Sequence, residues 1–156
     1  MSSLKVGPDD HPEAALKHLT DASVLLTGGR FDGASYLSGY VVESALKSVL
    51  LHDHCANAAG HDPSLLKQHH DKLKYKPFGH DLTRLALANL TGPGVNYWPG
   101  LSAGSAGSPP SILKWNPESR YWPGGLVSQT EAEAHLAWAE FVAKASVVRM
   151  TLDGVI

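Results

Sequence analysis

Residues 32–58 form the segment that most restricts how this chain can fold. When the segment is drawn as a helix at 100° per residue, apolar side chains fall on nearly all of its sides. They include Leu37, Val41 and Leu51 on one side and Val42, Leu46, Val49 and Leu50 on another. A helix without a solvent-facing side needs other helices around it. The segment therefore predicts an all-α fold, with this helix in the middle of an up-and-down bundle of four to five helices.

Further helices are expected where apolar periodicity follows a start signal. Asp10 and Glu13 have capping-box spacing, and so do Thr130 and Glu133, which predicts long helices starting at Asp10 and at Thr130. Shorter helices are expected over residues 64–73 and after an N-cap at Asp81. The last helix is expected to bury Ala132, Leu136, Ala139, Ala143, Val147 and Met150.

A long irregular connection, residues 91–129, precedes the last helix. Thirteen of its 39 residues are Gly or Pro, which excludes a long helix or a central strand. Its tryptophans, Trp98, Trp115 and Trp122, either hold the loop against the core or stack on bases or sugars. Residues 104–110, GSAGSPP, are the expected tip. With this insertion included, residues 1–156 are predicted to form one domain.

One narrow polar strip interrupts the apolar surface of the central helix: Tyr36, Tyr40, Glu43 and Lys47 project within roughly 60° of one another. An unpaired charge inside a protein costs several kcal/mol, so Glu43 needs partners, and Arg120 is a further candidate across the bundle. The strip is either an internal network that fixes helix register or the lining of a cleft for a nucleotide or a partner.

Three stretches resemble the HEPN family (higher eukaryotes and prokaryotes nucleotide-binding). They are residues 14–51, with YLSGYVVESALK at 36–47 as the core, GHDL at 79–82, and 118–146, which begins ESRYWPGG. The resemblance implies a dimeric helical bundle that acts as an RNase, an RNA-binding module or the companion of a minimal nucleotidyltransferase. RNase members carry an Arg followed by a His after four to six residues, and none of the four arginines here has that spacing.

We therefore expect a non-catalytic module, toxin–antitoxin-like, that binds a nucleotide, RNA or a nucleotidyltransferase partner. The alternatives are an RNase in which His80 replaces the missing histidine, and a structural assembly subunit. Asp81 is expected to cap a helix, whereas His80 can accept or donate a proton near neutral pH. Arg120 offers a donor fork that suits phosphate. The predicted ligand-binding residues are Tyr36, Tyr40, Glu43, Lys47, His80, Arg120 and Tyr121.

No metal or cofactor is expected, although six of the nine histidines lie between residues 52 and 80. His52 and His54 would point about 160° apart on a helix, and neither CxxC nor HExxH occurs. The net charge of -2 excludes a broad basic surface for nucleic acid. The lone Cys55, the lack of a signal sequence and the lack of a long apolar run predict a cytoplasmic protein without a membrane segment.

Overall fold

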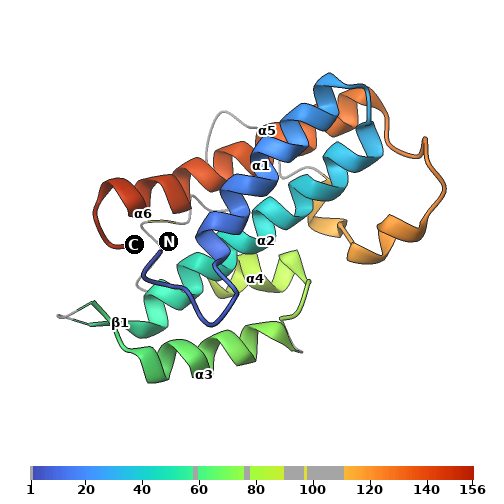
Figure 1. The fold of residues 1–156 in the computed structure, drawn as a ribbon. Helices are drawn as coiled ribbons and strands as arrows, with labels where there is room; N and C mark the ends of the chain where they lie inside the picture. The colour runs from blue at the N-terminus through green and yellow to red at the C-terminus, as the bar shows by residue number, and fades with distance from the viewer. Residues whose placement is uncertain (1, 58–59, 76–77, 90–96, 98–110) are drawn as a thin grey trace.

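The structure is a computed structural model that describes residues 2–57, 60–75, 78–89, 97 and 111–156 (Figure 1). It is mainly helical, which confirms the all-α prediction. Helix α1 (His11–Thr27) and helix α2 (Phe31–Cys55) are joined by a short turn and lie side by side, with α5 (Gln129–Ala143) against both. These helices form the long axis of the bundle. Helix α3 (Pro63–Lys74) lies near the C-terminal end of α2, and α4 (Leu82–Ala88) lies against the middle of α2.

The last helix continues beyond α5 through a π-helical turn (Lys144–Val148) into α6 (Arg149–Leu152). A small element was not predicted: β1 (Ala56–Asn57) pairs antiparallel with β2 (Gly60–His61) directly after α2. Within the described ranges, no helix combines the length and the apolar character needed to cross a membrane.

Helix α2 is buried on nearly all sides, as its sequence predicts. Val41, Val42, Leu46, Val49 and Leu51 have no exposed surface. The helices around α2 contribute the remainder of the core, which includes Leu66, Leu73, Leu82, Leu85 and Trp138. Burial of this apolar area supplies the main favourable free energy of folding.

The predicted caps are partly confirmed. The Asp10 carboxylate accepts a hydrogen bond from the Glu13 backbone N–H, and that of Asp81 accepts one from the Arg84 N–H. The predicted start of the last helix at Thr130, with Glu133, is wrong. Ser128 is the N-cap, and its hydroxyl accepts from the N–H of Glu131 at 3.2 Å.

The predicted apolar stripe of the last helix is wrong at one position. His135 is buried in α5, whereas Leu136 is half-buried. Trp138, Val142 and the predicted Ala132, Ala139 and Ala143 complete the buried face of this helix. Apolar periodicity favours leucine over histidine on this face, but His135 is buried because Ser35 and Ser111 hydrogen-bond both of its ring nitrogens.

The irregular connection contains two 3-10 helices, η2 (Ser111–Lys114) and η3 (Pro117–Tyr121). Trp98 and the expected tip at 104–110 lie outside the described residues. Trp115, between η2 and η3, packs directly on Gly39 of α2. A Cβ atom at Gly39 would lie 2.3 Å from the indole, so the close approach requires glycine. This contact holds the connection against α2, as one of the two interpretations of the tryptophans predicts.

Candidate functional site

The charged half of the polar strip lies inside the protein. Lys47 Nζ is 2.7 Å from Glu43 Oε1, and the two residues are 4% and 5% exposed. Each charge has lost nearly all of its water, so the pair is held by mutual attraction and by its other hydrogen bonds. A ligand in solvent has little access to either group.

His80 connects the buried pair to the surface. Its Nδ1 is 2.8 Å from Glu43 Oε2, and its side chain is half exposed just before the Asp81 cap of α4. An ionised carboxylate only accepts hydrogen bonds, so Nδ1 carries the proton in this pair. The lone pair of a neutral His80 then resides on Nε2, where it can accept a proton.

An aromatic wall continues the strip from Glu43 toward the start of α2. The Tyr40 ring lies 4.7 Å from Trp115 and 5.2 Å from Tyr36, and its phenol receives a hydrogen bond from the Tyr36 hydroxyl at 3.3 Å. Burial and this hydrogen bond raise the pKa of the Tyr40 phenol. Tyr40 therefore stays protonated at neutral pH, and the wall is uncharged.

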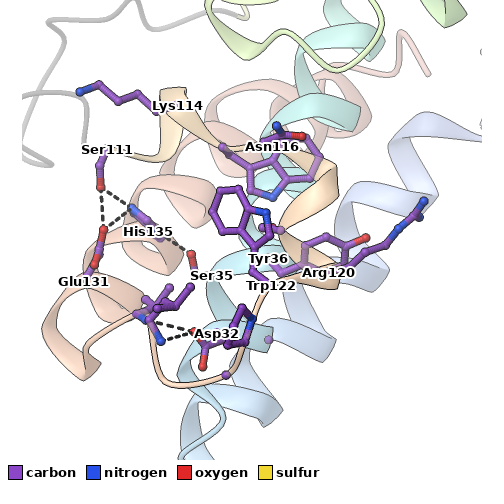
Figure 2. Close-up of a pocket in the computed structure, with 17 residues that line it drawn as sticks. Asp32, Ser35, Tyr36, Ser111, Lys114, Asn116, Arg120, Trp122, Glu131 and His135 are labelled. Carbon is purple, nitrogen blue, oxygen red and sulfur yellow. Dashed lines mark hydrogen bonds and ion pairs between the residues drawn. The ribbon is translucent and has the colours of Figure 1, made fainter.

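A cavity of about 620 Å³ lies on the other side of this wall (Figure 2). The first turns of α2 and α5, the two 3-10 helices and residues 122–127, here called the strap, enclose it. Tyr36, Trp115 and Trp122 give it aromatic surface. This volume lies within the range of roughly 300–1,000 Å³ that is usual for small-molecule sites.

The strap is fastened to α2 by one carboxylate. Asp32 accepts hydrogen bonds from the backbone N–H groups of Gly125 at 2.7 Å and of Leu126 and Val127 at 3.0 Å each (Figure 2). These bonds lower the pKa of Asp32. Its oxygens are therefore occupied, and Asp32 acts as an anchor for the cavity rim.

A chain of hydrogen bonds forms a second wall of the cavity. His135 Nδ1 lies 2.7 Å from Ser35 Oγ, and His135 Nε2 lies 2.8 Å from Ser111 Oγ. The Ser111 hydroxyl donates to Glu131 Oε1 at 3.1 Å. Burial lowers the pKa of His135, which is therefore neutral near pH 7. This hydrogen-bond chain holds the Glu131 side chain, which is 42% exposed, at the cavity.

Two cations line the same cavity. The Arg120 guanidinium lies 4.7 Å from the centre of the Tyr121 ring, and the phenols of Tyr121 and Tyr36 raise its pKa, so it keeps its charge. Lys114 projects from η2 near Ser111. Neither cation forms an ion pair with a carboxylate in the part of the chain that the structure describes.

The structure divides the predicted ligand-binding residues into two groups. Glu43, Lys47 and His80 are linked by hydrogen bonds, and Tyr40 joins them through its ring contact with His80. Arg120 belongs to the cavity and is not a partner of Glu43. Tyr36 contacts both groups because it lies on the wall between them. Tyr121 is exposed beside Arg120.

Sequence reasoning missed the residues that make the cavity polar: Asp32, Ser35, Ser111, Glu131 and His135. One signal was present. His135 lies three residues after Ala132 and four before Ala139, so a polar residue falls on the buried face of an apolar helix. Asp32 and Ser111 carry no comparable signal, because their partners lie far away in the sequence.

The histidines pair in an unexpected way. His52 Nδ1 lies 3.0 Å from His61 Nε2. The His54 ring stacks on the His69 ring, with 4.6 Å between the ring centres. Among the residues that the structure describes, no group of three or more His, Cys, Asp or Glu side chains could hold a metal ion.

Comparisons with the models of known protein families, with curated proteins and with solved structures gave no match. The resemblance to HEPN domains therefore rests on the residues quoted above and stays a prediction.

Proposed function

We propose that this chain is a non-catalytic, HEPN-like binding module that holds a nucleotide, or the end of an RNA strand, in the 620 Å³ cavity. The observation that carries the proposal is the combination of aromatic surface with two cations, Arg120 and Lys114, that line one cavity and form no ion pair with a carboxylate among the described residues. Stacking of a base on an aromatic side chain contributes about 1–3 kcal/mol. An Arg fork binds phosphate oxygens through charge-assisted hydrogen bonds. The chain has a net charge of -2, so this local pair of cations suits a small anion better than a long duplex.

The further properties of the proposal follow from the HEPN resemblance. We propose a homodimer, with a minimal nucleotidyltransferase as its partner in a toxin–antitoxin-like pair. A cytoplasmic location agrees with the lone cysteine, Cys55, which is buried and free.

Binding is tested by titrating the protein with nucleoside monophosphates while tryptophan fluorescence and heat are recorded. We expect Trp115 and Trp122 emission to be quenched and Arg120→Ala to weaken binding about tenfold or more, as loss of a charge-assisted bond requires. Arg149→Ala is the matched control, because Arg149 is exposed on α6 and pairs with Asp153. Absence of binding to every nucleotide, or equal affinity of the two variants, contradicts the proposal.

A ribonuclease is the second candidate, and the Glu43–His80 pair favours it. Glu43 fixes the proton on Nδ1 of the half-exposed His80 side chain and leaves Nε2 to accept one, as a general base requires. RNA cleavage that both His80→Ala and Arg120→Ala abolish, and that His54→Ala leaves intact, would establish this activity in place of simple binding.

The structural-subunit alternative is supported by the exposed apolar side chains of the strap. Trp122 and Leu126 are 55% and 60% exposed and lie within five residues of each other, so a partner that covers the strap would bury apolar area. Light scattering during size-exclusion chromatography shows whether they are covered in a dimer, since Leu126→Asp would then yield a monomer.

A further inference from the structure

The protons of the Ser35–His135–Ser111–Glu131 chain can be assigned in one consistent way. Ser111 has one hydroxyl proton, and it is donated to the Glu131 carboxylate. Ser111 Oγ must then accept from His135, so the proton of the neutral imidazole lies on Nε2. His135 Nδ1 is left as an acceptor and receives the Ser35 hydroxyl proton. The hydroxyl protons of Ser35 and Ser111 and the imidazole proton of His135 are thus all donated to groups of the protein.

This assignment makes the wall at Glu131 an acceptor surface. The carboxylate has lone pairs beyond the one that Ser111 occupies, because each of its oxygens has about two acceptor sites. Asp32, the other carboxylate of the cavity, is already occupied by three backbone N–H groups. Among the described residues that line the cavity, Glu131 is therefore the carboxylate with acceptor sites open on both oxygens, whereas Asp32 Oδ1 is fully occupied.

The acceptor wall and the cation lie on different sides of the cavity. In Figure 2, Ser111, His135 and Glu131 lie together on one side, and Arg120 lies on the opposite side, with its guanidinium at the outer edge of the site and Tyr36 and Trp122 in between. A matching ligand carries two adjacent hydrogen-bond donors at one end, an aromatic ring system next to them and an anionic group at the other end.

We propose that the cavity prefers a guanine nucleotide, with the N1–H and exocyclic 2-amino group of guanine donating to the Glu131 carboxylate. The inference rests on the proposed nucleotide-binding function and names the base. Guanine alone among the common bases places an imino and an amino donor side by side, the arrangement that a carboxylate accepts with both oxygens. Adenine offers a ring-nitrogen acceptor at the corresponding place, which would face the Glu131 oxygens without a proton between them.

The experiment compares GMP, AMP, IMP and 2′-deoxy-GMP by calorimetry on the full chain. We expect GMP to bind roughly 10- to 100-fold more tightly than AMP, with IMP, which lacks the 2-amino group, between them. Glu131→Gln should remove most of the preference, because it weakens the binding of GMP and removes the repulsion between the carboxylate and the adenine ring nitrogen. Glu133→Gln is the control, since Glu133 is exposed on the same helix, does not line the cavity and accepts a hydrogen bond from Gln129.

The outcomes separate the two proposals. Failure of every nucleotide to bind overturns the proposed function and the base preference together. Equal binding of GMP and AMP, or a preference that survives Glu131→Gln, overturns the guanine inference alone. A loss of affinity for 2′-deoxy-GMP that disappears in Glu131→Gln also overturns it, because the carboxylate would then bind the ribose hydroxyls.

Discussion

Lys47→Met is expected to lower the free energy of unfolding by about 3–5 kcal/mol, the usual effect of removing one member of a buried ion pair. Lys47 is 4% exposed, and its ammonium lies 2.7 Å from Glu43. Methionine fills a similar volume, so the main change is the loss of the positive charge beside the Glu43 carboxylate, whose side chain is 7% exposed. Urea unfolding followed by circular dichroism gives the difference between the variant and the wild type.

Two further variants show whether the loss of stability comes from the charge of Glu43 that is left without Lys47. Adding Glu43→Gln to Lys47→Met removes the remaining charge and is expected to recover much of the stability. Lys67→Met is the matched control, because Lys67 and Asp71 have the same i,i+4 spacing at 2.9 Å but are 72% and 50% exposed. The control should change stability by less than about 0.5 kcal/mol. If Lys67→Met and Lys47→Met lowered the free energy of unfolding equally, burial of the Glu43–Lys47 pair would contribute nothing to the effect.

Mild acid is expected to destabilise the fold between pH 6.5 and pH 4. Seven histidines have a pKa below that of a free imidazole, with burial as the first cause in each: His11, His18, His52, His61, His69, His70 and His135. Burial, and then the charge of Lys47, lowers the pKa of His11 to about 4. The unfolded chain therefore binds protons at a higher pH than the folded chain does.

The stability conferred by a neutral His11 is complete above pH 6.5 and is lost as the pH falls toward 4. His11 alone accounts for roughly 3 kcal/mol over this window. Urea unfolding at several pH values between 7.5 and 4.5 measures the slope, and His11→Gln should reduce it. A free energy of unfolding that stays constant from pH 7 to pH 5 would contradict the expected burial of these histidines.

The sequence predicted the part of the site that lies on one helix. The regular geometry of a helix places four polar residues on one face: Tyr36, Tyr40, Glu43 and Lys47. The other faces of this helix are apolar, which indicates that the helix is surrounded by others and that the polar face is buried. The contact between Glu43 and His80 depends on how α4 meets α2, and helical periodicity contains no information on that. The GHDL similarity placed His80 at a helix start, but not beside Glu43.

The cavity could not be predicted in the same way, because it is built from segments without periodicity. The hydrogen bonds of Asp32 to residues 125–127 join positions more than ninety residues apart, and backbone N–H groups leave no mark in the sequence. His135 was overlooked because its neighbour Leu136 fits an apolar stripe better. Its burial is stabilised by Ser35 and Ser111, which hydrogen-bond both ring nitrogens.

The contact between Gly39 and Trp115 gives a signature by which relatives of this chain can be recognised. Any side chain at position 39 would occupy the volume of the indole, so the two residues have to be exchanged together during evolution. Homologous chains that keep both are expected to carry the same folded strap and cavity. Homologous chains with alanine or a larger residue at position 39 should lack the tryptophan at position 115. They should therefore also lack the contact that holds the irregular connection against α2.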